Sequence, residues 1–123
     1  MDLIEKINSR TLKLAVIGLG YVGLQLAVEF GKRFDTVGFD VKRSRLDMLR
    51  QGNDNTLEIT SEELASAVKL SFSDDPDALA DRDVFIVTVP TPVDKYNQPD
   101  LLPLKLASET VGKVMKDGAL VIF

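Results

Sequence analysis

Three glycines and one aspartate near the start of the chain form the pattern with the clearest chemical meaning. Gly18, Gly20 and Gly23 have the spacing G-x-G-x-x-G, and Asp40 follows the second glycine by 20 residues. At this spacing the first glycine permits a tight turn, the second lets backbone approach a pyrophosphate, and the third lets a helix pack closely on a sheet. A carboxylate at such a distance accepts hydrogen bonds from the ribose hydroxyls of an adenosine and repels a 2′-phosphate. These residues therefore predict a dinucleotide site, with NAD favoured over NADP.

The basic residues that follow Asp40 complicate the choice of cofactor. Lys42, Arg43 and Arg45 lie just beyond it, and basic side chains at this place can bind the 2′-phosphate of NADP. We still favour NAD, because Asp40 stands at the end of the expected strand itself. In a competing interpretation the glycines only make a tight turn and Asp40 caps the next element. The register of all four positions favours dinucleotide binding over that interpretation.

A second turn, Val89-Pro90-Thr91-Pro92, follows an apolar run further along the chain. In open parallel sheets, ligands bind outside the carboxyl ends of the strands, at the point where the strand order reverses. We therefore expect Val89, Pro90 and Thr91 to line the second wall of the cleft that the glycine turn opens. The residues alone support equally well a simpler interpretation, in which two prolines end a strand.

An acidic cluster, Asp74, Asp75 and Asp77, raises the question of a metal site. These carboxylates surround the expected start of a short helix at Pro76, where negative charge interacts favourably with the helix dipole. We therefore predict solvated capping residues and no metal site.

The elements that must position these residues follow from the apolar pattern. Short β-branched runs predict buried strands, and apolar residues at spacings of three and four predict helices. Strands are expected at 14–17, 36–40, 70–73, 84–89 and 119–123. Helices are expected from Tyr21, from capping boxes at Ser44–Asp47 and Thr60–Glu63, from Pro76 and from about Leu101, with Gly52 and Gly118 as helix ends and a loop over 53–59. Strands alternating with helices predict a parallel sheet covered on both faces.

The composition of the 123-residue chain indicates how large a core it can form and which kinds of site and partner it excludes. A hydrophobic content of 45% suffices for the core of one domain. The net charge of −4 gives no electrostatic footprint for nucleic acid or an anionic membrane. The chain has no cysteine and no histidine, which excludes disulfides, thiolate metal sites, a cysteine nucleophile and the commonest general base, and suits a cytoplasmic protein. Its apolar runs are far shorter than the ~20 residues of a membrane-spanning helix.

The two ends of the chain suggest how it is organised. Residues 1–12 form a polar lead-in with about one helical turn, and the dinucleotide-binding domain is expected over 13–123. The last residues, ALVIF, lie inside an apolar strand, so we expect the chain to be the N-terminal piece of a longer protein.

Three segments resemble a known family. KLAVIGLGYVGLQLAVEFGK, GFDVKRSRLDMLRQGND and VTVPTPVDKYNQPDLLPLKLASETVGKVMKDGALVIF are similar to the NAD-binding domain of the UDP-glucose/GDP-mannose dehydrogenase family. The similarity runs from about Lys13 to Phe123 and is greatest to the UDP-N-acetylhexosamine 6-dehydrogenase branch, which makes uronic acids for bacterial surface polysaccharides. Gln25 departs from the proline that many relatives carry, but it lies in the first helical turn, where either residue is acceptable.

The resemblance implies a role for individual residues. Tyr21 and Val22 would contact the cofactor through their backbone at the glycine turn. Asp40 would bind the adenosine ribose with Arg45 beside it, and relatives that pair these two residue types still use NAD. Thr91 would contact the cofactor on the nicotinamide side, so the resemblance favours a ligand role for Val89, Pro90 and Thr91.

The resemblance also implies the reaction. Members of the family oxidise the C6 alcohol of a nucleotide sugar to a carboxylate in two hydride transfers to NAD, through a cysteine-linked intermediate. The catalytic groups belong to segments beyond residue 123, so we expect this chain to bind the cofactor, with no catalytic residue of its own. For the full-length protein we expect a UDP-sugar substrate, a homodimer, and neither nucleic acid nor membrane as a partner.

We therefore predict an α/β fold, a Rossmann-like doubly wound parallel sheet in three layers with strand order 3-2-1-4-5. Two other functions remain open from the residues: a UDP-glucose or GDP-mannose 6-dehydrogenase, and a non-catalytic NAD-sensing module. A β-hydroxyacid dehydrogenase is disfavoured. Such enzymes often carry methionine at the position of Val22 and an asparagine-arginine pair at that of Asp40-Val41.

Overall fold

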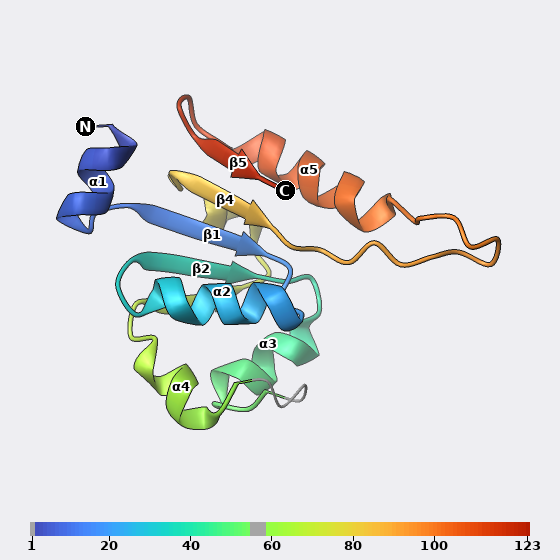
Figure 1. Cartoon of the computed structure of the whole chain (residues 1–123), viewed down its shortest axis with the longest axis horizontal. Coiled ribbons are helices and arrows are strands. Elements are labelled where there is room, and N and C mark those ends of the chain that lie inside the picture. Colours follow the sequence, from blue (N-terminus) through green and yellow to red (C-terminus); the bar gives the residue numbers. More distant parts are fainter. Residues whose placement is uncertain (1, 55–58) are drawn as a thin grey trace.

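The computed structural model describes residues 2–54 and 59–123 and contains one five-stranded parallel sheet (Figure 1). The strand order is β3-β2-β1-β4-β5, which confirms the predicted Rossmann-like topology. The strands are β1 (Lys13–Ile17), β2 (Asp35–Phe39), β3 (Leu70–Ser73), β4 (Val84–Val87) and β5 (Leu120–Ile122). Because β1 pairs with both β2 and β4, the strand order reverses on the two sides of β1.

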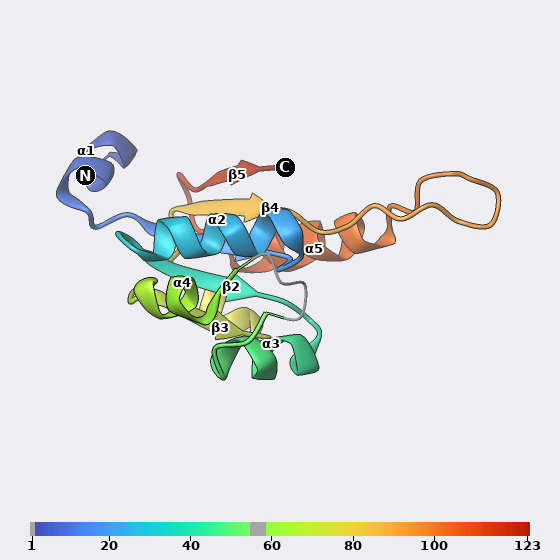
Figure 2. The same ribbon diagram turned by 60° about the horizontal axis from the view of Figure 1, so that its bottom comes forward.

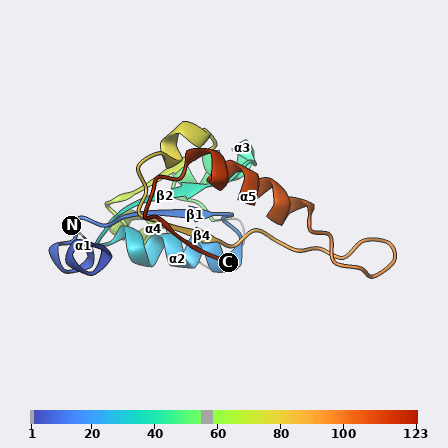
Figure 3. The ribbon, with the colours of Figure 1, turned by 90° about the horizontal axis from the view of Figure 1, so that it is seen from above.

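Helices cover the sheet on both faces, as Figures 2 and 3 show for α2 and α5. The helices are α1 (Leu3–Ser9), α2 (Tyr21–Gly31), α3 (Arg43–Arg50), α4 (Ser61–Ser66) and α5 (Leu102–Val114), with a short 3-10 helix η1 (Pro76–Leu79). Residues of α2, α3 and α4 share one buried cluster, and residues of α5 and η1 share another. No helix in the described ranges combines the length and the apolar character needed to cross a membrane.

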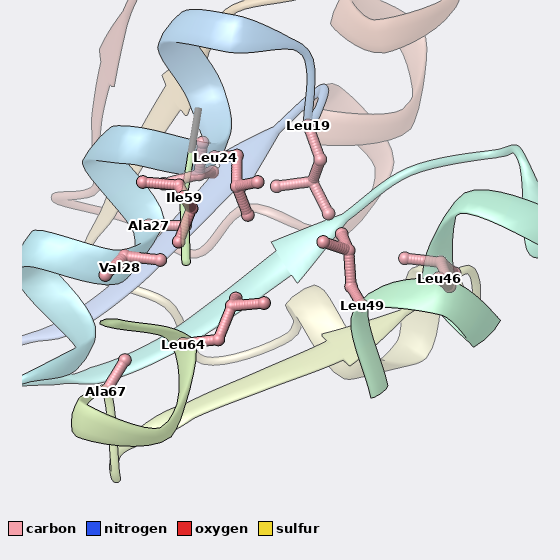
Figure 4. Close-up of a cluster of buried hydrophobic side chains, with 10 residues drawn as sticks. Leu19, Leu24, Ala27, Val28, Leu46, Leu49, Ile59, Leu64 and Ala67 are labelled. Atoms are coloured by element: carbon pink, nitrogen blue, oxygen red, sulfur yellow. The ribbon is translucent and has the colours of Figure 1, made fainter. Parts of the chain in front are cut away.

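Two buried clusters explain why the sequence of β1 is an unbroken apolar run. Val16 belongs to the cluster under α2, whereas Ala15 and Ile17 belong to the cluster under α5. Alternate residues of this central strand therefore face two different layers, and both faces are buried. Figure 4 shows the side chains of this first cluster converging from the glycine turn, from α2 and α3, and from residues 59–67 in and around α4. They are Leu19, Leu24, Ala27, Val28, Leu46, Leu49, Ile59, Leu64 and Ala67.

Two predicted helix starts have different outcomes. The Thr60–Glu63 capping box is confirmed, because the Thr60 hydroxyl accepts a hydrogen bond from the Glu63 N–H at 3.1 Å. The Ser44–Asp47 box is wrong, since α3 begins at Arg43 and Lys42 is its N-cap residue without a side-chain cap. The N–H of Lys42 instead donates to the carboxylate of Asp40, in the turn that leads into the helix.

The other boundaries differ from the prediction by a few residues. The predicted strand 84–89 ends at Val87, and α5 ends at Val114, before the extended residue Met115. Gly118, with φ of +82°, therefore lies in the turn before β5 and does not end the helix. The lead-in forms a seven-residue helix, α1, longer than the single turn expected. Of the expected loop 53–59, residues 55–58 lie outside the described part of the chain.

A buried aspartate joins several elements at the amino end of the sheet. Asp83 precedes β4 and is 3% exposed. It accepts hydrogen bonds from Lys6 Nζ of α1 at 2.6 Å and from the N–H of Lys13 at 2.8 Å, and it pairs with Lys116 Nζ at 3.0 Å. Burial by itself would raise the pKa of Asp83, but these three donors outweigh burial and lower the pKa to about 2. The carboxylate is therefore ionised across the physiological range and ties α1, β1 and the α5–β5 turn together.

Candidate dinucleotide site

The glycine turn connects β1 to α2, and its three glycines are required for different reasons. Gly18 has φ of +97°, and a Cβ there would lie 2.9 Å from the N atom of Val89. A Cβ on Gly23 would overlap the carbonyl oxygen of Gly18 and the hydroxyl of Thr88. A Cβ on Gly20 would meet nothing within 4 Å. The fold itself therefore excludes side chains at Gly18 and Gly23, whereas at Gly20 it leaves an open space beside the backbone.

Leu19, between the first two glycines, is held by both of its backbone groups and by its side chain. Its N–H donates to Asp40 Oδ2 at 2.9 Å. Its carbonyl oxygen accepts from Nε and Nη2 of Arg45 at 3.0 and 2.8 Å. Its side chain is 1% exposed in the first core cluster. These contacts fix the position of Leu19 without any ligand.

Neighbouring strands hold the rest of the turn. The N–H of Gly18 donates to the carbonyl of Phe39 at 2.8 Å, and the Gly18 carbonyl accepts from the Thr88 hydroxyl at 2.7 Å. Strand β2 and the end of β4 therefore hold this turn from both sides of β1.

Asp40 lies at the carboxyl end of β2, where the spacing predicted it. Its Oδ2 accepts from the N–H of Leu19, and its Oδ1 accepts from the N–H of Lys42 at 3.0 Å. A carboxylate offers about four lone-pair positions, so two protein hydrogen bonds leave acceptor capacity for hydroxyl groups of a ligand. The structure thus gives Asp40 a second role, that of fixing the glycine turn, beside its predicted role at the ribose.

A cavity of about 690 Å³ opens beside the glycine turn at the carboxyl edge of the sheet. Part of its lining comes from α3 and the residues before it, and another part comes from α5. The side chains of Val41, Leu102 and Leu106 line it and are 80%, 55% and 52% exposed. Most of the exposed lining is apolar, and Asp40, Lys42, Arg45 and Asp100 add charged groups to it, a combination typical of small-molecule sites.

The structure brings six of the ten predicted site residues to this cavity: Gly18, Gly20, Asp40, Arg45, Val89 and Pro90. Tyr21 and Val22 begin α2 with exposed side chains, and the N–H groups of a first helical turn have no intrahelical acceptor. Their predicted backbone contacts are consistent with this position. Gly23 serves the packing of α2 against the turn.

Thr91 is not among the cavity-lining residues. It is exposed at the start of the segment between β4 and α5, which projects away from the sheet in Figure 1. This segment is folded back on itself, since Val93 pairs with Pro99 and the Asp94 carboxylate accepts from the N–H of Tyr96 at 2.8 Å. The predicted contact of Thr91 with the nicotinamide side stays a prediction.

Arg45 is more deeply engaged with the protein than the sequence suggested. Its guanidinium contacts the Leu19 carbonyl and forms an ion pair with Asp54, with Nη1 2.8 Å from Oδ1. Side-chain exposure is 9% for Arg45 and 0% for Asp54. Its predicted contact with the ribose also stays a prediction, while its contact with the glycine turn is a feature of the structure.

Sequence reasoning did not identify Leu19, Thr88 and Asp54 as parts of the site. Leu19 occupies an unspecified position of the glycine pattern, and Thr88 and Asp54 carry no motif. The apolar wall formed by Leu102 and Leu106 does have a signal, because the two residues are four apart on one helix and outside the stripe that faces the core.

In the acidic cluster near Pro76, the predicted capping role is confirmed for Asp75. Asp75 Oδ1 accepts from the N–H of Asp77 at 2.9 Å and so caps η1. Asp74 pairs with Arg43 at 3.4 Å. In the part of the chain that the structure describes, acidic residues form no group of three able to hold a metal ion.

Comparison with known proteins agrees with this geometry. Residues 12–123 match the family model described as "UDP-glucose/GDP-mannose dehydrogenase family, NAD binding domain". The chain is 56% identical over 114 residues to a UDP-N-acetyl-D-glucosamine 6-dehydrogenase of Pseudomonas aeruginosa, an alignment that covers 93% of this chain and 27% of that protein. The chain thus spans about a quarter of the length of the curated relatives that it matches.

Solved structures give the same result. The UDP-D-ManNAc dehydrogenase of Pyrococcus horikoshii superposes with a TM-score of 0.78 at 35% identity, over 89% of this chain and 27% of that one. A UDP-glucose dehydrogenase from Pyrobaculum islandicum superposes with a TM-score of 0.78 at 32% identity, over 92% of this chain and 28% of that one.

Proposed function

Because the chain belongs to the UDP-glucose/GDP-mannose dehydrogenase family and is its NAD-binding domain, we propose that the whole protein is an NAD-dependent nucleotide-sugar 6-dehydrogenase. Its substrate would be a UDP-N-acetylhexosamine, whose C6 alcohol is oxidised to the carboxylate of a uronic acid. The observation that carries this proposal is the 56% identity over 93% of the chain to a UDP-N-acetyl-D-glucosamine 6-dehydrogenase.

The site residues suggest how NAD is held. The pyrophosphate would lie at the open side of Gly20 and the N-terminus of α2, where backbone N–H groups and the helix dipole favour negative charge. The adenosine ribose would hydrogen-bond to Asp40, and the adenine would fill the apolar cavity between Val41 and Leu106. The nicotinamide side would extend toward Val89, Pro90 and Thr91. When bound, NAD supplies the hydride acceptor.

The surroundings of Asp40 favour NAD over NADP. Of the basic residues that follow it, Arg43 pairs with Asp74, and Arg45 is buried against Leu19 and Asp54. These two cations are therefore engaged elsewhere in the protein, whereas Lys42 lines the cavity beside Asp40. The preference for NAD thus rests on the Asp40 carboxylate itself, at the ribose end of the cavity. A 2′-phosphate there would meet like charge at short range.

The cofactor proposal is tested by titrating the chain with NAD and NADP in a calorimeter. We expect NAD to bind at least about tenfold more tightly, as repulsion worth about 1.4 kcal/mol requires. Asp40→Asn removes the negative charge and keeps an acceptor oxygen, so the two affinities should approach each other. Asp40→Ala should also weaken NAD binding, because it releases the N–H of Leu19. Equal affinities of the wild type for NAD and NADP would contradict the role of Asp40.

The substrate proposal is tested on the whole protein by following NADH formation with UDP-N-acetylglucosamine, UDP-N-acetylgalactosamine, UDP-glucose and GDP-mannose. The proposal predicts that an acetamido sugar gives the highest kcat/KM. A preference for UDP-glucose or GDP-mannose would reassign the branch, and tight NAD binding without turnover of any of the four sugars would favour the NAD-sensing alternative. A UDP-sugar-binding homodimer located in the cytoplasm is the corresponding proposal for the full-length protein.

A further inference from the structure

A buried chain of hydrogen bonds, which we call the relay, runs from Asp54 through Arg45 to the Leu19 carbonyl of the glycine turn. Asp54 Oδ1 accepts from Arg45 Nη1 at 2.8 Å, and Nε and Nη2 of the same guanidinium both donate to the carbonyl oxygen of Leu19. Asp54 Oδ2 accepts from the N–H of Ile59 at 3.0 Å, which fixes the carboxylate in turn. The side chain of Asp54 is fully buried, and the cavity lining includes Arg45 but not Asp54.

The end of this relay controls the orientation of one peptide unit. The Leu19 carbonyl and the Gly20 N–H belong to the same planar trans peptide, so they point in opposite directions. By holding the Leu19 carbonyl toward the buried side, Arg45 directs the Gly20 N–H away from it. A phosphate is bound by N–H groups and repelled by carbonyl oxygens, so this orientation decides the sign of the partial charge that the turn presents.

Glycine makes this peptide unit able to turn over. Gly20 now has φ of −76°, and a flipped peptide would require a positive φ, which glycine adopts about as readily. The preceding unit, between Gly18 and Leu19, is fixed at both ends by the Thr88 hydroxyl and by Asp40. The contact with Arg45 therefore restrains the part of the turn that glycine would otherwise leave loose.

We propose that Asp54 is a positioning residue for the phosphate-binding turn. Through Arg45 it keeps the Leu19–Gly20 peptide oriented with its N–H toward the cofactor pyrophosphate, without touching the cofactor itself. The proposal rests on the NAD site described above. A buried ion pair is often no more stabilising than apolar side chains of similar volume, so a positioning role accounts for the pair better than stability does.

The test compares a ligand that has the pyrophosphate with one that does not. ADP-ribose and adenosine are titrated into the wild type and into Asp54→Asn, by calorimetry for the first and by NMR shift titration for the second. We expect Asp54→Asn to weaken ADP-ribose about tenfold, as the loss of one charge-assisted hydrogen bond would, and to leave adenosine within about twofold. Equal loss for both ligands, or no loss for ADP-ribose, would overturn the proposal.

Asp83→Asn is the matched control, since Asp83 is also a buried aspartate with a cationic partner but lies at the other end of the sheet. It should lower stability and leave the ratio of the two affinities unchanged. A wild type that binds neither ligand would overturn the assignment of the site, and the relay with it, which separates that failure from the failure of the relay alone.

A measurement on the wild type keeps the proposal open to refutation if Asp54→Asn fails to fold. On addition of ADP-ribose the amide signal of Gly20 should shift, while the Arg45 Nε–H signal should keep its position because Arg45 stays on the Leu19 carbonyl. A large shift of Arg45 with an unchanged Gly20 would mean that the guanidinium binds the ligand directly, and would overturn the proposal.

Discussion

The two ends of the sheet each contain a buried aspartate paired with a cation, and the remaining partners of these pairs differ. At the amino end, Asp83 is held by the ammonium groups of Lys6 and Lys116, which come from separate elements. At the carboxyl end, Asp54 meets the guanidinium of Arg45, whose other donors go to the backbone of the glycine turn.

The difference shows that similar ion pairs can have different functions. Side-chain cations from several elements hold those elements together, so the contribution of Asp83 should appear in the free energy of unfolding. A guanidinium that ends on a backbone carbonyl fixes the shape of a turn, so the contribution of Asp54 should appear in ligand affinity. The two glycines of the turn differ in the same way. Gly23 faces the protein, so its substitution should affect stability, whereas Gly20 faces open space, so its substitution should affect ligand binding.

The largest effect is expected for Gly23→Ala. The new methyl group would overlap the Gly18 carbonyl, which is backbone and is already bonded to the Thr88 hydroxyl, so neither group can move cheaply. We expect the free energy of unfolding to fall by about 3 kcal/mol, the upper range for overpacking, with loss of NAD binding as a consequence. Urea unfolding followed by circular dichroism measures the change.

Gly112→Ala is the control for that substitution. Gly112 lies within α5, and a Cβ there would meet nothing within 4 Å, so alanine should stabilise the helix by up to about 1 kcal/mol. If Gly23→Ala were as well tolerated as Gly112→Ala, this result would contradict the close packing of α2 against the glycine turn.

The next largest effect concerns the amino end of the sheet and depends on pH. The folded-state pKa of Asp83 is about 2, against an ordinary value of 3.8, because the donors from Lys6, Lys13 and Lys116 outweigh burial. Since the folded pKa is the lower one, the stabilisation is fully present above about pH 4 and is lost as the pH falls toward 2. Its size is about 2 to 3 kcal/mol, from ~1.4 kcal/mol for each pKa unit of difference between the unfolded and folded states.

Asp83→Asn isolates this contribution. The difference in unfolding free energy between wild type and variant should shrink as the pH falls from about 4 to about 2, because protonation removes the same charge from the wild type. NAD affinity at neutral pH should be unchanged in the variant. A stability gap that stays constant over this pH range would contradict the assigned role of Asp83.

The sequence predicted those parts of the molecule that depend on local pattern. The apolar runs located the strands to within two residues, and the glycine spacing with Asp40 identified the turn that borders the cavity. The predicted start of α3 was wrong because a local hydrogen bond competes: the N–H of Lys42 donates to Asp40 ahead of the predicted Ser44–Asp47 box. The predicted end of α5 was wrong because Met115 is extended, so that the helix ends before the turn that contains Gly118.

Contacts between distant residues could not be predicted in this way. The Thr88 hydroxyl reaches the Gly18 carbonyl across 70 positions, and Arg45 reaches the Leu19 carbonyl across 26. Nothing in residue type or spacing encodes such pairs, because they depend on which strand ends the folded sheet places together. The residues predicted to touch a ligand were therefore easier to identify than the residues that hold them in place.

The smallest effect on the fold is expected for Gly20→Ala, which tests the ligand-facing side of the comparison. The backbone of Gly20, with φ of −76°, lies in the negative-φ range open to alanine, and the methyl group would enter open space. We expect the free energy of unfolding to change by less than about 0.5 kcal/mol, as for surface substitutions.

NAD affinity should nevertheless fall at least about tenfold in Gly20→Ala, because a methyl group at this place keeps the pyrophosphate from the backbone. Calorimetry with NAD and with adenosine separates the two effects, since adenosine has no pyrophosphate and should bind as before. If Gly20→Ala destabilised the fold as much as Gly23→Ala does, the two glycines would not differ in what they face, and the distinction between the protein side and the ligand side of the turn would be lost.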